Sequence, residues 1–315
     1  MAKTGEIVMT TTVSMIGFGE AGAILGEDLA AQGVKIYAYD RLLEDPAKRA
    51  ALHEKAQRCG VQLCESAAQA IALGEWIISA VTADNALEVA LSAASLMKPG
   101  QLFIDINSVA PSTKRAAAIA MQQHGVDYID AAVMAPVPPQ RLKTPILLGG
   151  QHATLVAERL SGLGMNVRVV AEVVGVASAI KMCRSIMIKG LEALTTECLS
   201  TARQYHAEDE VLASLHKSFP QMGWDGALPH YLISRVAEHG RRRAEEMKEV
   251  AKTARDVDVV PNMSQAIVSA QLGLVDAMLD ADIDYSHLEP FDWINLIDTL
   301  YGKPITHESA VREKR

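Results

Sequence analysis

Three glycines at fixed spacing follow the apolar run at residues 13–16, and together they could hold a dinucleotide. The first glycine of such a turn permits a tight bend, the second lets the backbone approach a pyrophosphate, and the third lets the next helix pack on the strand. The N-terminus of that helix then faces the phosphates. The alternative is a glycine turn in an α/β domain that binds no nucleotide. We predict cofactor binding by Gly17, Phe18, Gly19, Glu20, Ala21 and Gly22.

Two charged residues at the end of the next apolar run could select between the nicotinamide cofactors. Asp40 follows residues 34–39, where a carboxylate would bond the ribose 2′-hydroxyl of NAD and repel the 2′-phosphate of NADP. Arg41, beside it, could instead accommodate that phosphate. The sequence therefore favours NAD and leaves NADP open.

A second cofactor loop is expected after the run WIISAV. Thr82 and Ala83 follow this run, and would lie at the carboxyl edge of a parallel sheet near the nicotinamide ribose. An ordinary strand-to-helix loop is the alternative for both residues.

The elements that must position these residues alternate along the first half of the chain. Short β-rich runs alternate with Ala-rich stretches, which is the pattern of a parallel sheet with crossover helices. Strands are expected at residues 13–16, 34–39, 76–81, 102–106, 128–129, 146–148 and 167–170.

The hydrophobic pattern changes near residue 171. After Gly175 the chain is predicted to be helical, with a long helix over about 176–204, shorter pieces to about 239, a charged segment at 241–255 and another helix after Pro261. We therefore predict an α/β fold in which an N-terminal Rossmann doubly wound sheet (1–171) precedes a C-terminal all-α domain (172–315).

The composition excludes several classes of protein. A chain of 315 residues, 49% of them hydrophobic, is long enough for two cores and too apolar for disorder. A net charge of −8 argues against a nucleic-acid partner. No run has the length of a membrane span and the N-terminus lacks a secretory pattern, so we expect a cytoplasmic protein without a membrane partner. The four cysteines match no zinc pattern, so no metal is expected.

Four ordered segments resemble the β-hydroxyacid dehydrogenase family, within the 3-hydroxyisobutyrate dehydrogenase and 6-phosphogluconate dehydrogenase superfamily. They are the glycine turn, Asp105-Ile-Asn-Ser-Val-Ala-Pro111, Asp130-Ala-Ala-Val133 and Gly175-Val-Ala-Ser-Ala-Ile-Lys181. The resemblance covers nearly the whole chain and indicates a less-characterised subgroup with its own C-terminal helical domain. It implies an NAD(P)-dependent dehydrogenase acting on CH–OH groups, and a homodimer formed through the helical domains.

The resemblance gives Lys181 the role of general acid/base, beside the hydroxyl or carbonyl that reacts. Partial desolvation lowers the pKa of a lysine, so that it can exchange a proton near neutral pH. Taken alone, a lysine in such a helix would be a surface residue that extends its charge to water. Asn107 and Ser108 are expected to bind substrate, Asn107 also facing the cofactor. A helix N-cap before Pro111 is their alternative role.

Three substrate positions depart from the family pattern. Ser185 replaces an asparagine one turn after the lysine, so its hydrogen bond is expected to need water or a different substrate group. Met134 and Ala135 begin a proline-rich segment where the family has a Gly-Gly loop that offers N–H groups to a carboxylate. We therefore expect a more apolar pocket and a bulkier substrate, including aryl-substituted alcohols.

The helical half carries two further charged features. Glu246 lies where the family has the aspartate of a Lys-Asp-Leu segment, while the lysine of that segment is missing. The run Arg241–Arg243 could bind an anionic substrate arm, because guanidinium pairs well with carboxylate or phosphate. A solvated helix start or a salt-bridged interface is the alternative for this run.

Three other functions stay open beside an NAD-dependent dehydrogenase with a small-molecule substrate. An imine reductase shares the fold, but its relatives usually replace the lysine, so Lys181 counts against it. A lyase could use bound NAD for transient oxidation in a retro-aldol or decarboxylating reaction. A non-catalytic nucleotide sensor would perform no reaction at all.

Overall fold

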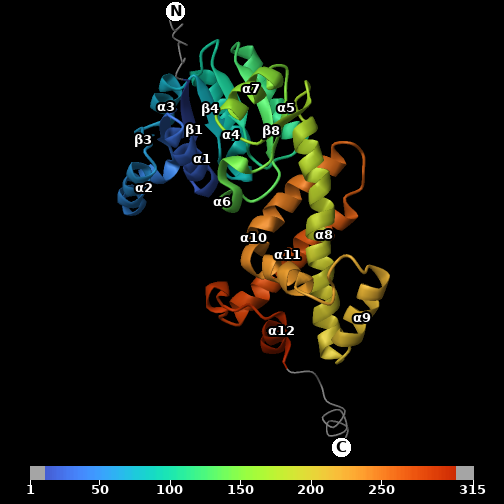
Figure 1. Cartoon of the computed structure of the whole chain (residues 1–315). Coiled ribbons are helices and arrows are strands. Elements are labelled where there is room, and N and C mark those ends of the chain that lie inside the picture. The colour runs from blue at the N-terminus through green and yellow to red at the C-terminus, as the bar shows by residue number, and fades with distance from the viewer. Residues whose placement is uncertain (1–10, 303–315) are drawn as a thin grey trace, which may run out of the picture. The chain divides into compact units, whose positions relative to one another are not determined.

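The computed structural model describes residues 11–302, which form two compact units (Figure 1). The first unit ends at Met182 and the second begins at Cys183, inside the long helix α8 (Val176–Gln204). This division lies later than residue 171, where the sequence changes its period. The reason is that Ala177, in the first turn of α8, still packs with Ala132 and Leu147 of the sheet.

The first unit is a sheet that has eight strands within the described residues. Its strands are β1 (Thr12–Ile16), β2 (Lys35–Tyr39), β3 (Gln62–Leu63), β4 (Trp76–Ser79), β5 (Leu102–Asp105), β6 (Asp127–Val133), β7 (Ile146–Gly149) and β8 (Val167–Ala171). They lie in the order β3-β2-β1-β4-β5-β6-β7-β8. The chain therefore reverses direction across the sheet between β1 and β4, which is where α/β folds of this kind bind ligands.

Helices cover both faces of this sheet, as a doubly wound fold requires. They are α1 (Glu20–Ala31), α2 (Pro46–Arg58), α3 (Ala67–Leu73), α4 (Ala83–Leu96), α5 (Pro111–Gln123), α6 (Val137–Gln140) and α7 (Ala153–Gly162), with short 3₁₀ turns η1 (Arg41–Glu44) and η2 (Arg141–Lys143). Alternate strand residues enter two separate cores: Ile36 packs in one and Tyr37 in the other. The predicted Rossmann fold is confirmed.

The sheet is mixed, so the expectation of an all-parallel sheet is wrong at one edge. Strand β7 runs antiparallel to β6, while β8 is parallel to β7. The chain turns back at once after β6, because Met134 N donates to Pro145 O at 2.8 Å. The residues between hold only α6 and η2, which are too short to serve as the crossover helix that usually connects parallel strands.

The second unit is helical. After α8 it contains α9 (Glu208–Ser218), α10 (Leu228–Arg255), α11 (Asn262–Asp280), the 3₁₀ turn η3 (Tyr285–His287) and α12 (Trp293–Tyr301). Its core joins Leu199 of α8 to Ile233 of α10, Leu274 of α11 and Trp293 of α12. None of the helices in the described part of the chain is long and apolar enough to cross a membrane.

One long helix replaces the separate pieces expected before and after residue 240. Helix α10 runs unbroken through Gly240, whose missing side chain allows α11 to approach closely. A Cβ at Gly240 would lie 2.4 Å from the Gln271 carbonyl oxygen, closer than real contacts allow. The glycine here serves helix packing and does not end the helix.

Candidate functional site

The glycine turn between β1 and α1 has a different steric reason for each glycine. Gly17 has φ +97°, and a Cβ there would lie 2.3 Å from the Ala80 carbonyl oxygen. A Cβ at Gly22 would lie 2.2 Å from the Gly17 carbonyl oxygen. A Cβ at Gly19 would meet nothing within 4 Å. Two glycines therefore build the turn, and the third keeps open the space above it.

That open space suits a phosphate group. Gly19 is the N-cap of α1, and no side chain caps the first N–H groups of the helix. Such N–H groups, together with the helix dipole, bind anions well. Phe18 precedes Gly19, and Glu20 and Ala21 begin α1, so all three belong to the backbone around this open space.

Asp40 lies at the end of β2 and already holds this turn. Its Oδ2 accepts from Phe18 N at 2.8 Å, and its Oδ1 accepts from Leu42 N at 2.9 Å. Each carboxylate oxygen can accept a second hydrogen bond. Asp40 can therefore bind a ribose hydroxyl while it fixes the backbone beneath the cofactor.

Lys55 is a contact to the turn that the motif does not indicate. Its Nζ donates to the carbonyl oxygens of Phe18 and Gly19, both at 2.9 Å, and lies 5.2 Å from the centre of the Phe18 ring. Lys55 comes from α2, where no short motif marks it. By holding both carbonyls, it fixes the orientation of the two peptide groups at the point of phosphate approach.

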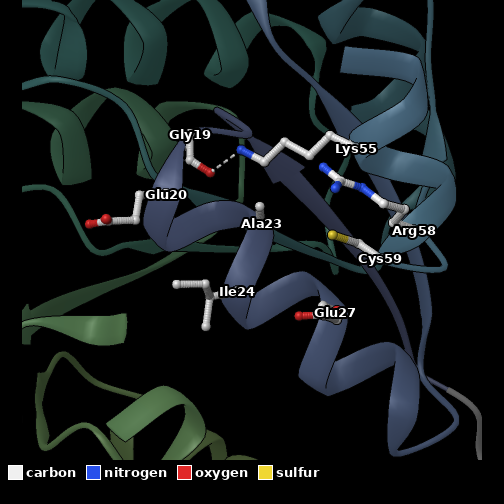
Figure 2. A pocket seen from close by; sticks show the side chains of 8 residues that line it. All are labelled: Gly19, Glu20, Ala23, Ile24, Glu27, Lys55, Arg58 and Cys59. Carbon is white, nitrogen blue, oxygen red and sulfur yellow. Dashed lines mark hydrogen bonds between the residues drawn. The ribbon is translucent and has the colours of Figure 1, made fainter. Parts of the chain in front are cut away.

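A cavity of about 540 Å³ opens beside Lys55 (Figure 2). Figure 2 shows that it lies between the start of α1 and the end of α2. Its lining residues are Gly19, Glu20, Ala23, Ile24, Glu27, Lys55, Arg58 and Cys59. Charges of both signs face it, and burial raises the pKa of the Cys59 thiol.

The loops after β2 and β4 are linked by a short polar chain. Arg41 Nη1 donates to Asn85 Oδ1 at 3.1 Å, and Asn85 Nδ2 donates to Thr82 Oγ1 at 2.6 Å. Thr82 is the N-cap of α4, although its side chain does not cap the helix, and Ala83 is the first helical residue. Arg41 is exposed, so its guanidinium stays at the surface beside Asp40.

Asn107 ties two strand ends together. Its Oδ1 accepts from Val81 N at 2.7 Å, its Nδ2 donates to Ser79 Oγ at 2.9 Å, and its backbone N donates to Asp105 Oδ1 at 2.9 Å. The side chain is buried. Asn107 therefore holds β4 and β5 in place, and one amide hydrogen and one lone pair of its side chain are left for a ligand.

Lys181 and Ser108 come together although 73 residues separate them. Lys181 Nζ donates a hydrogen bond to Ser108 Oγ, and both residues are half-buried. Ser108 follows β5 at the carboxyl edge of the sheet, and Lys181 lies in the part of α8 that belongs to the first unit. A lysine amine is thus held beside a hydroxyl at the edge that also carries the glycine turn.

Comparison with known proteins gives the family. The family model described as the NAD binding domain of 6-phosphogluconate dehydrogenase matches residues 12–170. The chain belongs to this family. An NAD(P)-binding domain is therefore present, and a domain of unknown function, DUF1932, matches residues 202–274 of the helical half.

Two solved structures are similar to this chain over most of its length. A conserved hypothetical protein from Sinorhizobium meliloti is 37% identical, with a TM-score of 0.75, over 93% of this chain and 97% of that chain. A conserved protein of unknown function, described as structurally similar to 3-hydroxyacid dehydrogenases, is 31% identical, with a TM-score of 0.68, over 85% of this chain and 98% of the other.

A curated enzyme is a more distant relative. Human mitochondrial 3-hydroxyisobutyrate dehydrogenase is 26% identical over 217 residues, which are 67% of this chain and 62% of that enzyme. The match therefore spans less than two thirds of the enzyme. It establishes homology to the NAD(P)-dependent hydroxyacid dehydrogenases of the family.

The proline-rich loop after β6 offers few free N–H groups. The N–H of half-buried Met134 is used in the bond to Pro145, Ala135 is half-buried, and Pro136 has no N–H. Arg141 fastens the loop to α1 through Asp28, with Nε to Oδ1 at 2.9 Å. The loop is thus anchored, and Met134, Pro136, Pro138 and Pro139 have no free N–H to offer a carboxylate.

Ser185 lies one turn after Lys181 on α8 but belongs to the second unit. It is buried, and its Oγ accepts from Lys189 Nζ at 3.4 Å. Lys189 also lies 2.9 Å from Glu246 Oε2, so Glu246 of α10 has a buried cation as partner.

The three consecutive arginines of the run Arg241–Arg243, in the middle of α10, all form ion pairs within the chain. Arg241 pairs with Asp276, Arg242 with Glu246 and Arg243 with Glu192. Burial raises the pKa of Glu192 and lowers that of Arg243, even though each opposes the shift of the other. Among the described residues, no group of three or more His, Cys, Asp or Glu could hold a metal ion.

Proposed function

We propose that this chain is an NAD-dependent dehydrogenase that oxidises a CH–OH group or reduces the matching carbonyl, with Lys181 as general acid/base. The observation that carries the proposal is the hydrogen bond from Lys181 to Ser108 at the end of β5. In the sheet, β5 lies two strands from β1, whose end carries the glycine turn. Homology to 3-hydroxyisobutyrate dehydrogenase supports the reaction class.

The residues of the chain would handle the proton and the orientation. Bound NAD would supply the hydride acceptor for the substrate carbon. In oxidation, the amine of Lys181 takes the proton of the substrate hydroxyl. In reduction, its ammonium returns a proton to the developing alkoxide oxygen. Because Ser108 Oγ accepts a hydrogen from either form of the amine, Lys181 keeps its position while its charge changes.

A screen of alcohols and hydroxyacids with both cofactors tests this function. A dehydrogenase accumulates reduced nicotinamide in proportion to product, which absorbance at the reduced-nicotinamide band measures. Turnover without net reduction would instead identify a lyase. Binding of NAD with no reaction on any compound would favour a sensor.

The substrate is proposed to be bulkier than a small hydroxyacid and includes aryl-substituted alcohols. The anchored loop after β6 supports this, because its prolines have no N–H and the Met134 N–H is already bonded, so it has fewer backbone donors for a carboxylate than a Gly-Gly loop. In the same screen, small hydroxyacids that react as fast as every aryl analogue would contradict the proposal.

NAD is expected to bind at least about tenfold more tightly than NADP, because the Asp40 carboxylate would repel a 2′-phosphate. Asp40→Ala should reduce the ratio of the NAD affinity to the NADP affinity. It should also weaken NAD binding, since Phe18 N loses its hydrogen-bond acceptor. Isothermal titration with each cofactor measures both effects. Arg41→Ala is the matched variant, and it should weaken NADP more than NAD. Equal affinities of the unmodified protein for the two cofactors would overturn this choice.

The proposed homodimer would form through one face of α8. Met187 and Leu194 share that face two helical turns apart, and Tyr205 follows directly after the end of α8; the three side chains are 66%, 56% and 78% exposed. Leu194 and Tyr205 also line a cavity of about 520 Å³ in the second unit. Exposed apolar stripes of this kind mark protein interfaces.

Leu194→Asp should convert dimer to monomer, because it buries a charge in the apolar interface. Size-exclusion chromatography with light scattering measures the mass. Leu155→Asp on α7 is the matched control, since Leu155 is 52% exposed in the first unit, and it should leave the dimer intact. A wild-type protein that is monomeric at all accessible concentrations would reject the dimer.

A further inference from the structure

Lys114 is a lysine of α5 with 0% of its side chain exposed. Its Nζ lies 2.9 Å from Asp105 Oδ1 and 3.7 Å from Asp130 Oδ1, and it donates to the Asp105 backbone carbonyl at 2.7 Å. Asp105 ends β5, and Asp130 lies opposite it in β6. A charge this deeply buried requires fixed partners of opposite sign. Lys114 therefore joins the carboxylates of two neighbouring strands.

The carboxylate of Asp105 holds the turn that presents Ser108. Its Oδ1 accepts from Asn107 N at 2.9 Å, one residue before Ser108. Its Oδ2 accepts from Tyr128 OH at 2.6 Å. Burial raises the pKa of Tyr128 well above its usual value, so the phenol stays a donor. We call residues 106–110 the Ser108 turn.

The carboxylate of Asp130 holds the start of the helix that presents Lys181. Its Oδ2 accepts from Gly175 N, Ser178 N and Ser178 Oγ, each at 3.0 Å. Gly175 has φ +103°, a conformation that favours glycine. Lys181 follows Ser178 by three residues, about one helical turn. We call residues 175–182 the Lys181 segment.

Helix α5 also touches this segment directly. A Cβ at Gly175 would lie 2.9 Å from Arg115 Nη1 and 3.3 Å from Pro111 Cβ, so α5 packs closely against the first residues of the Lys181 segment. The ammonium of Lys114 thus stands between the two carboxylates that fix the two halves of the Lys181–Ser108 pair. Asp130 Oδ1 has no hydrogen-bond partner, which leaves Lys114 as the cation that offsets its charge.

We propose that Lys114 is the positioning residue that holds the Ser108 turn and the Lys181 segment against each other. The inference deepens the proposed function and rests on it, because it assigns the preorganisation of the Lys181–Ser108 pair to one buried cation. Without that cation, Asp105 and Asp130 are two like charges on adjacent strands, and their repulsion acts on both catalytic segments at once. Removal of the Lys114 charge is therefore expected to loosen both segments together.

Hydrogen–deuterium exchange of the full-length protein without ligand tests the proposal. In Lys114→Met, exchange should be about tenfold faster or more in both the Ser108 turn and the Lys181 segment. Lys114→Arg, which keeps the charge, should stay within about threefold of wild type. Lys143→Met is the matched control: Lys143 donates to Gly164 O on the surface, so neither segment should change. An effect in only one segment, or none in either, would overturn the proposal.

The charge dependence separates positioning from simple packing. Asp105, Tyr128, Asp130 and Arg115 are the titratable or charged groups around Lys114 and the start of the Lys181 segment. In Lys114→Met, addition of Asp130→Asn should restore slow exchange, because it removes one of the two like charges. An excess of exchange over wild type that persists with Asp130→Asn would show that Lys114 only fills space.

Two further measurements complete the test. If Lys114→Met alone does not fold, Lys114→Met/Asp130→Asn compared with Asp130→Asn measures the same coupling. Once a substrate is found, Lys114→Met should lower kcat about tenfold or more while the affinity for NAD stays within about threefold. The exchange result stands without any reaction, so a screen that finds no dehydrogenase activity counts against the proposed function and leaves the exchange test intact.

Discussion

Lys181→Met is expected to lower kcat about a thousandfold with NAD and an identified substrate, because a positioned general acid/base contributes roughly 10²–10⁴ in rate. Methionine has a similar length and fills the half-buried space, but it can neither take nor return a proton. Steady-state kinetics with both substrates varied measure kcat. The affinity for NAD should change little, since the cofactor turn is built by β1, α1 and Lys55.

The control for this result is another lysine of the same unit. Lys98→Met replaces an exposed lysine beyond α4 and should leave kcat unchanged. A Lys181→Met enzyme with full turnover would remove Lys181 from the mechanism. It would also make the resemblance to lysine-dependent dehydrogenases a likeness of fold alone.

The sequence predicts those parts of the site whose role follows from the residues next to them in the chain. The glycine turn, Asp40 after the second strand and the loop at Thr82 all follow from a strand, a turn and a helix in immediate succession. Their positions in the sheet confirm this order. Lys181 was placed only by resemblance, because a lysine in an apolar helix has no local signal of its role.

The parts that could not be predicted depend on contacts between distant segments. Lys55 donates hydrogen bonds to the carbonyl groups of two residues that lie 36 and 37 positions earlier in the chain. In the sequence, Lys114 has the pattern of a surface lysine at the start of an Ala-rich helix, and only the fold shows that it is buried beside β5 and β6. Strand β3 has two residues, too few to show a period. The antiparallel direction of β7 depends on how the chain returns after Met134. The apolar pattern of a strand does not indicate its direction.

Asp40 shows how one residue can fit a motif and still carry a second role. The motif assigns its carboxylate to a ribose, whereas the structure also gives it the N–H groups of Phe18 and Leu42. Cofactor choice and the shape of the turn are therefore linked through one side chain. A substitution at Asp40 changes both, and only the ratio of the NAD and NADP affinities separates the effect on cofactor preference from the effect on the turn.

The three glycines of the turn should separate cofactor binding from folding. Gly19→Ala is expected to weaken NAD about thirtyfold or more, because its new Cβ occupies the open space where the backbone must approach the pyrophosphate. Its free energy of unfolding should fall by about 1 kcal/mol at most, since φ at Gly19 is −68° and no atom opposes the Cβ. Isothermal titration and urea unfolding measure the two quantities.

Gly22→Ala should instead damage the fold itself, because its Cβ would lie 2.2 Å from the Gly17 carbonyl oxygen and the backbone must move. We expect a loss of about 2–3 kcal/mol in the free energy of unfolding, together with the loss of NAD binding. Gly162→Ala at the end of α7 is the matched control, since its Cβ, like that at Gly19, meets nothing within 4 Å; it should leave NAD binding unchanged and should not lower the free energy of unfolding, because Ala favours a helix over Gly. If folded Gly19→Ala bound NAD as tightly as wild type, the pyrophosphate would have to lie elsewhere, and the open space above Gly19 would have no part in cofactor binding.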